Sequence, residues 1–109
     1  MKAKPIVPRE LANRDVEGAI GYYLREASAE VAIAFIAALE KAYAEIARAP
    51  GAGSPRYAHE LNLGGLRSWP LKRYPQLIFY VERTDYVDVW RVLHGERDIP
   101  GGVRLPEGR

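Results

Sequence analysis

Two stretches in the first half of the chain carry apolar residues at helical spacing. Between residues 9 and 25 such residues recur every three or four positions, which predicts an amphipathic helix. They are Leu11, Ala12, Val16, Ile20 and Tyr23. Gly18 and Gly21 interrupt this helix at a cost of about 1 kcal/mol each relative to alanine. We therefore expect another segment to pack closely against them.

The second stretch, from Ala29 to Arg48, keeps the same spacing to its end. Its apolar positions are Ala32, Phe35, Leu39, Tyr43 and Ile46. Ser28 is the expected N-cap, because its hydroxyl can accept a hydrogen bond from an early helical N–H. Pro50-Gly51 ends the helix. Since only a few residues separate the two helices, they are predicted to form an antiparallel hairpin.

After residue 65 the apolar residues alternate with a period of two, which predicts strands. The three expected strands are Leu66–Lys72, Gln76–Glu82 and Tyr86–His94. Pro70 interrupts the first, as at a sheet edge or a bulge. Short loops join the three runs, so they are predicted to form an antiparallel meander.

Alternation also predicts which side chains share a face of the sheet. In the second strand Leu77, Phe79 and Val81 face one way, while Ile78 and Tyr80 face the other. Strict alternation in the third strand separates two sets. These are Val87, Val89, Arg91 and Leu93 on one face, and Tyr86, Asp88, Trp90, Val92 and His94 on the other.

The remaining segments complete the predicted architecture. Prolines flank Ile6 and Val7, which limits that run to a short edge strand. Residues 49–65 hold glycines and prolines without periodicity and are expected to form a surface loop. From about residue 99 an extended or mobile tail is expected. Residues 1–109 are thus predicted to form one two-layer α+β domain: a short strand, a helical hairpin and a three-stranded meander.

Composition narrows the class of protein. The 109 residues carry a formal net charge of +2, and the sequence pI is about 9.0. So small an excess of basic residues is more typical of an ordinary protein surface than of a dedicated nucleic-acid-binding protein. No cysteine is present, so a disulfide or thiolate metal site is excluded. Neither a secretory signal nor a membrane span is recognisable, and a cytoplasmic location is expected.

The common catalytic motifs are absent from the sequence. It contains no G-x-S-x-G, no glycine-rich phosphate loop and no H-E-x-x-H. The only two histidines, His59 and His94, are isolated, which does not predict a metal site. We therefore expect neither a metal nor a cofactor.

One cluster of residues that could bind a ligand combines Arg67, Lys72 and Arg73 with Trp69 and Tyr74, without an acid among them. Basic residues interleaved with aromatic ones can bind RNA phosphates and stack on bases. The same residues also suit a sheet edge protected by charge, with the tryptophan in the core, and this plainer interpretation is favoured.

A second cluster, residues 91–98, lies at the end of the last strand. His94 is its natural acid–base candidate, because histidine titrates near neutral pH. A lone histidine is nevertheless more often structural than catalytic. By strict alternation along the strand, Arg91 points to the face opposite His94 unless a bulge intervenes. Arg97 and Asp98 can pair with each other.

These residues resemble a known family. Leu77-Ile78-Phe79-Tyr80, followed after a turn by V-W-R-V-L-H-G-E-R-D at residues 89–98, resembles the C-terminal signature of ParE-type toxins. The upstream order is similar too, including the long helix closed by Pro50-Gly51 and the basic residues of Leu66-Arg67 and Lys72-Arg73-Tyr74. The resemblance extends from about Ile6 to Asp98.

The resemblance implies a toxin of a type II toxin–antitoxin, or plasmid stabilisation, system with the RelE/ParE fold. It implies a hetero-oligomer with a cognate antitoxin, usually one with a ribbon-helix-helix DNA-binding part. ParE-type toxins are generally described as inhibitors of DNA gyrase that act by binding. The target-binding candidates are then Arg67, Trp69, Arg73, Arg91, His94, Arg97 and Asp98.

The related RelE-type toxins imply an alternative, a ribosome-dependent and metal-independent mRNA endonuclease. Its catalytic set would be Arg67, Arg73, Arg91 and His94. Gly95, however, follows His94 where some ribonuclease toxins carry tyrosine. This departure favours the non-enzymatic alternative, and an inactive toxin homologue is the third.

Overall fold

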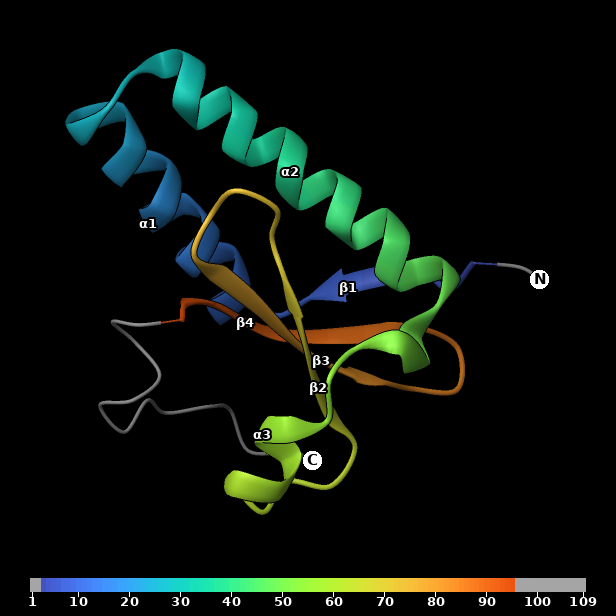
Figure 1. The fold of residues 1–109 in the computed structure, drawn as a ribbon. Helices are drawn as coiled ribbons and strands as arrows, with labels where there is room; N and C mark the ends of the chain where they lie inside the picture. The colour runs from blue at the N-terminus through green and yellow to red at the C-terminus, as the bar shows by residue number, and fades with distance from the viewer. Residues whose placement is uncertain (1–2, 96–109) are drawn as a thin grey trace.

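The computed structural model describes residues 3–95, so the predicted tail lies outside the described residues. The elements, in chain order, are β1 (Ile6–Pro8), α1 (Glu10–Glu26), α2 (Ala29–Arg48), η1 (Pro50–Ala52), α3 (Arg56–Glu60), β2 (Leu66–Pro70), β3 (Gln76–Glu82) and β4 (Val87–His94). This order confirms the predicted α+β fold, in which a helical hairpin precedes a three-stranded meander (Figure 1).

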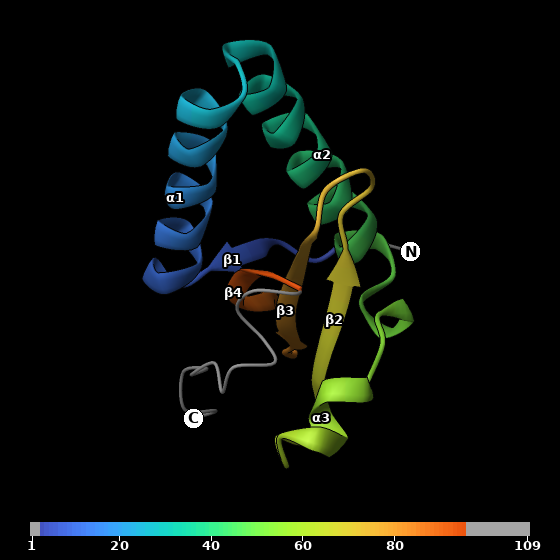
Figure 2. The same ribbon diagram turned by 60° about the vertical axis from the view of Figure 1, so that its left-hand side comes forward.

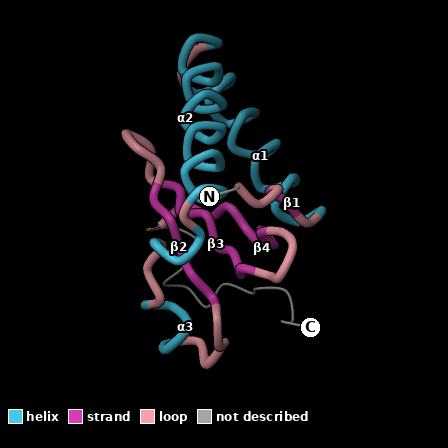
Figure 3. Tube along the Cα trace, turned by 90° about the vertical axis from the view of Figure 1, so that its right-hand side faces the viewer, coloured by secondary structure: helices cyan, strands magenta, loops and turns pink. Residues whose placement is uncertain are grey.

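One mixed sheet, with strand order β1-β4-β3-β2, supports both long helices. β2, β3 and β4 are antiparallel neighbours, whereas β1 pairs with β4 in parallel. The helices lie together on one side of the sheet (Figure 3). β1 and β2 are the two edge strands, and both contain proline, as expected for an edge.

The long helix α2 forms as the sequence predicts. The Ser28 hydroxyl accepts a hydrogen bond from the Val31 backbone N–H at 3.1 Å, which confirms the N-cap. The residues of α2 that are buried against the sheet and α1 are Ala32, Phe35, Leu39, Ala42 and Ile46. Tyr43 is partly buried beside them.

The first helix departs from two expectations. Leu11 is 42% exposed, so the buried stripe of α1 begins at Ala12. A Cβ at Gly18 would meet no atom within 4 Å, and one at Gly21 would meet only the Arg25 side chain. The expected close packing at these glycines is therefore wrong. The helices diverge from their connection, and neither glycine lies at a close approach (Figure 2).

A register shift in β4 changes which side chains share a face. Phe79 pairs with Arg91, but Tyr80 pairs with Val89, so Trp90 is an extra residue in β4. Such a bulge interrupts the alternation of side chains along a strand. The strict alternation predicted for this strand is therefore wrong beyond Val89.

Beyond the bulge, Val92 joins the apolar cluster under the helices, together with Val87 and Val89. Leu93 joins Trp90 in the cluster on the opposite face. This shift reverses the faces predicted for Val92 and Leu93, while Val87, Val89 and Trp90 keep theirs.

Residues 49–65, predicted as a loop without secondary structure, contain the short helices η1 and α3. Tyr57 and Ala58 of α3 pack against the outer face of the sheet, where Leu66 and Phe79 are buried. The prediction failed because five helical residues are too few to establish a period. No helix among residues 3–95 is long and apolar enough to cross a membrane.

Candidate functional site

On the edge of β4 that faces away from β3, a carboxylate of α1 holds the C-terminal part of the strand, which β1 does not reach. β1 pairs only with Val87–Val89. Beyond that point the Asp15 carboxylate accepts a hydrogen bond from the Val92 backbone N–H at 3.0 Å. The Arg91 guanidinium donates from Nε to Oδ2 at 2.7 Å and from Nη2 to Oδ1 at 2.8 Å. Both side chains are mostly buried, so the Arg91 charge is matched within the fold.

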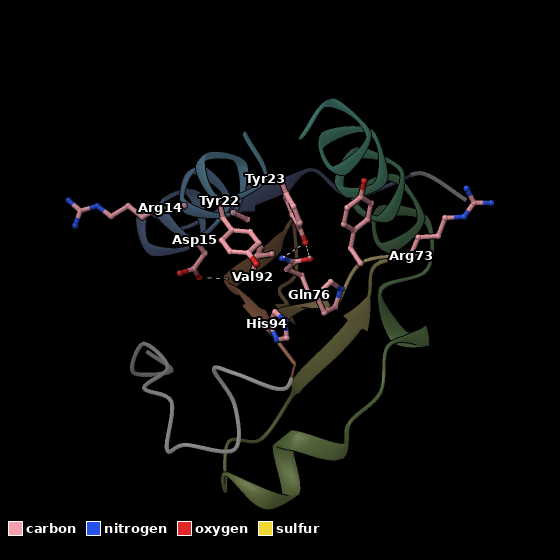
Figure 4. A pocket seen from close by; sticks show the side chains of 12 residues that line it. Arg14, Asp15, Tyr22, Tyr23, Arg73, Gln76, Val92 and His94 are labelled. Atoms are coloured by element: carbon pink, nitrogen blue, oxygen red, sulfur yellow. Dashed lines mark hydrogen bonds between the residues drawn. The ribbon is translucent and has the colours of Figure 1, made fainter. Parts of the chain in front are cut away.

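A pocket of about 630 Å³ lies beside this ion pair, between α1 and the ends of β3 and β4. Its lining includes Tyr22 and Tyr23 of α1, Tyr74, Gln76 and His94 (Figure 4). His94 reaches this pocket because the bulge moves it, together with Val92, to the helix side of β4, and both residues line the pocket. We call it the tyrosine pocket.

Aromatic contacts and hydrogen bonds, one of them from a buried amide, fix the side chains on one side of the tyrosine pocket. The Tyr23 ring lies 5.4 Å from the rings of both Phe35 and Tyr74, measured between centroids. The Tyr74 hydroxyl donates to the Val31 carbonyl at 3.1 Å. The Gln76 amide donates to the Tyr23 hydroxyl at 3.2 Å. These bonds hold two of the three tyrosines in place.

Two arginines stand at the mouth of this pocket. Arg14 lies on α1 and Arg73 lies on the connection between β2 and β3, and their guanidinium groups extend to opposite sides (Figure 4). Arg14 forms an exposed ion pair with Glu10 at 2.8 Å. Arg73 is exposed and has a φ of 69°, in the left-handed region that non-glycine residues rarely adopt.

The edge strand β2 uses its outward hydrogen-bonding groups within the chain. The N–H and carbonyl of Ser68 pair with the carbonyl and N–H of Ser54, each at 2.9 Å. The Leu66 N–H donates to the Leu63 carbonyl at 3.2 Å, and Pro70 has no N–H to offer. Little of this edge is open to an added strand.

Arg67 and Trp69 of this strand have structural contacts. The Arg67 guanidinium donates to the Gly53 carbonyl at 2.8 Å. Trp69 is partly buried and packs against the main core, as the sheet-edge interpretation expected.

A wider groove, about 1170 Å³ in volume, lies between α2, β2 and the β2–β3 connection. We call it the alanine groove, because the α2 side contributes Ala34, Ala37 and Ala38. Its other lining residues include Trp69 from the sheet, the basic Lys41, Lys72 and Arg73, and the acidic Glu45. It is therefore an apolar trough with a mainly basic rim.

A third polar cluster lies on the face of the sheet away from the helices. Asp88 is 4% exposed and accepts from Arg9 Nε at 3.0 Å and Arg83 Nε at 3.1 Å. Burial raises the pKa of this carboxyl, but the hydrogen bonds from the two guanidinium groups outweigh it and lower the pKa below its usual value. The Arg9 guanidinium also lies over the Trp90 ring, 5.0 Å from its centroid.

The structure brings together only some of the predicted site residues. The tyrosine pocket joins Arg73 and His94, and the alanine groove joins Trp69 and Arg73. Arg67 and Arg91 are bonded to other parts of the chain. Arg97 and Asp98 lie outside the described residues.

Sequence reasoning missed Asp15, Tyr22 and Gln76. Of these three, only Tyr22 could have been noticed in the sequence, because it adds a second aromatic residue directly before Tyr23 in the amphipathic helix. Among residues 3–95, no group of three or more His, Cys, Asp or Glu is placed to hold a metal ion.

Comparisons with known proteins agree with this architecture. A protein-family model described as "ParE toxin of type II toxin-antitoxin system, parDE" matches residues 6–99. The chain is similar to a solved structure, "Chromosomal ParDE TA system from P. aeruginosa", with a TM-score of 0.73 and 17% sequence identity. That match covers 86% of this chain and 98% of the other, and at this identity it bears on the fold alone. No curated protein matches the chain.

Proposed function

The chain belongs to the ParE toxin family of type II toxin–antitoxin systems, and from this premise we propose that it inhibits DNA gyrase by binding and is neutralised by a cognate antitoxin. Binding alone requires no general acid or base. The alternative, a ribonuclease, requires several cations on one phosphate together with a proton-transfer group.

The ion pair between Arg91 and Asp15 is the observation that best supports action by binding. Arg91 is one of the four residues that a ribonuclease would use, and it donates two hydrogen bonds to a carboxylate. To reach a phosphate it would have to leave Asp15, which would stay mostly buried without its cation. Arg67 also has a partner within the chain, since its guanidinium donates to the neutral Gly53 carbonyl.

The packing at Gly95 supports the same proposal. Its N–H donates to the Pro75 carbonyl at 2.9 Å. A Cβ at this position would lie 3.2 Å from that carbonyl oxygen, a tight contact. A tyrosine here, as in some ribonuclease toxins, would require the neighbouring backbone to move.

For the antitoxin we propose a helical segment bound in the alanine groove. Small residues let another backbone approach α2 closely, and the basic rim favours acidic side chains on the partner. A helix in a groove satisfies its own backbone, whereas an added strand would need open edge groups. The bonds between Ser54 and Ser68 leave few such groups on β2.

Two matched substitutions on α2 test this docking site. Ala34→Glu places an acid in the alanine groove, while Ala44→Glu places the same residue on an exposed part of the helix outside it. In binding assays with the protein of the adjacent small reading frame, Ala34→Glu should weaken affinity at least about 10-fold. Ala44→Glu should change it little. Equal effects would contradict this location, and separate elution of the wild-type proteins at micromolar concentration would contradict the partnership.

Induced expression tests the target. With the DNA-damage response and mRNA cleavage measured in parallel, a gyrase inhibitor should induce the first without the second. Cleavage of mRNA alone would favour the ribonuclease. If the chain induced neither response but still bound its antitoxin, it would be an inactive homologue.

A further inference from the structure

We propose that the tyrosine pocket binds one nucleotide of a nucleic-acid single strand, with the base inside the pocket and the flanking phosphates at Arg14 and Arg73. This proposal goes beyond gyrase inhibition and antitoxin binding. It concerns the pocket between α1 and the ends of β3 and β4, on the other side of the Arg73 connection from the alanine groove.

The size and lining of the pocket suit a base. Its volume of about 630 Å³ falls within the range of roughly 300–1,000 Å³ typical of small-molecule sites. Tyr22, Tyr23 and Tyr74 provide aromatic surfaces on which a base can stack. Tyr22 is 42% exposed, so its ring is the one most available to a ligand.

The charges around the pocket suit phosphates. Arg14 and Arg73 extend to opposite sides of the mouth, and His94 lies between them (Figure 4). A base in the pocket would lie between the two arginines, and each guanidinium group, which extends away from the pocket in Figure 4, would turn inward to meet a neighbouring phosphate. The ion pair of Arg14 with Glu10 is exposed, and such pairs contribute so little that Arg14 can exchange to a phosphate.

The acidic and amide groups of the pocket indicate binding without base readout. The Asp15 carboxylate is occupied by Arg91 and the Val92 N–H, so it does not offer a free acid to repel phosphate. The Gln76 amide is buried and bonded to the Tyr23 hydroxyl, which leaves it poorly placed to read a base edge. Recognition by stacking and charge tolerates any base.

Titration calorimetry with the purified full chain, without antitoxin or gyrase, tests the proposal. The probes are a five-nucleotide oligodeoxyadenylate, adenosine 5′-monophosphate and adenosine. The oligonucleotide should bind most tightly and adenosine most weakly, because a strand places phosphates at both arginines. Tyr22→Ala should weaken oligonucleotide binding about 5- to 100-fold, and Tyr22→Phe should restore it.

The cation variants separate this site from general attraction to a basic protein. Arg14→Gln and Arg73→Asn should each weaken binding and lower the salt dependence, by about 0.7 in the slope of log K against log salt. Asparagine suits position 73 because it tolerates a positive φ. Arg48→Gln, exposed on α2 outside both sites, and Leu24→Ala, exposed on α1, are the matched controls.

Three results would overturn the proposal. One is the absence of oligonucleotide binding at millimolar concentration, and another is an equal effect of Arg48→Gln and Arg73→Asn. The third is equal affinity for the oligonucleotide and the monophosphate, which would reassign the pocket to free nucleotides. Because the assay contains neither antitoxin nor gyrase, failure here would leave the proposed toxin function in place.

Discussion

The two faces of the sheet are held by different forces. Under α1 and α2 the inner face buries a large apolar cluster that includes Phe35, Ile46 and Tyr80. The outer face buries a smaller cluster with Phe79, and beside it the carboxylate of Asp88 between two guanidinium groups. Burial of apolar area thus holds the inner face, and paired charges supplement a thinner core on the outer face.

The two phenylalanines of the chain lie one on each face and provide the sharpest test of this difference. Phe35→Ala should lower the free energy of unfolding by about 3–5 kcal/mol, because the ring is fully buried and touches both Tyr23 and Tyr74. Phe79→Ala should cost less, because its cluster is smaller. Chemical denaturation measures both, and a loss under about 1 kcal/mol for Phe35→Ala would remove it from the core.

The outer face should depend on Asp88 more than an ordinary surface does. Asp88→Asn removes the charge shared by Arg9 and Arg83, with an expected loss of about 2–4 kcal/mol. This range allows for the partial exposure of both guanidinium groups. Asp85→Asn, exposed in the preceding turn, is the control and should change the unfolding free energy by under about 0.5 kcal/mol. If Asp88→Asn lowered the free energy of unfolding no more than Asp85→Asn does, the Asp88 cluster would add no stability.

Acid should weaken the outer face through the same residue. The pKa of Asp88 is lower in the folded chain than its usual value of about 3.9. Its contribution is therefore complete above about pH 4 and is lost as the pH falls through the folded pKa. Unfolding measured from pH 6 downward should show a smaller pH dependence for Asp88→Asn than for the wild type. Parallel curves would contradict this linkage.

Alkali should weaken the inner face through Tyr43. Burial raises the pKa of Tyr43 to about 12, above its usual value of about 10. The neutral phenol thus contributes stability that is complete below about pH 10 and is lost as the pH rises toward 12. Tyr43→Phe should remove this part of the alkaline loss, while the acid limb should stay unchanged.

The inner face could be predicted well from local patterns. Helical spacing identified Phe35, Leu39 and Ile46, and alternation identified Ile78 and Tyr80. These signals are strong because one-sided burial imposes the period of the element on its sequence. The glycines of α1 were misleading, because a small residue is required at a close contact but also occurs where nothing packs.

The site depended on contacts that no local pattern contains. The bulge at Trp90 leaves the sequence of β4 alternating as before, yet it moves Val92 and His94 to the helix side. The partner of Arg91 is Asp15, 76 residues earlier in the chain. The Asp15 contact forms where α1 covers the part of β4 that β1 does not reach, which tertiary packing alone determines.

Whether the proposed action of this chain is binding or catalysis can be decided by a parallel assay of purified variants. Supercoiling by gyrase and mRNA cleavage on ribosomes are measured with the wild type, with His94→Ala, with a charge reversal at Arg97 and with residues 100–109 deleted. A proton-transferring histidine contributes roughly 10²- to 10⁴-fold to cleavage, so its loss would nearly abolish a ribonuclease. We expect gyrase inhibition that survives His94→Ala and is weakened more by the two C-terminal changes. Unimpaired supercoiling, together with robust mRNA cleavage that requires His94, would rule out gyrase inhibition by binding and identify a ribonuclease.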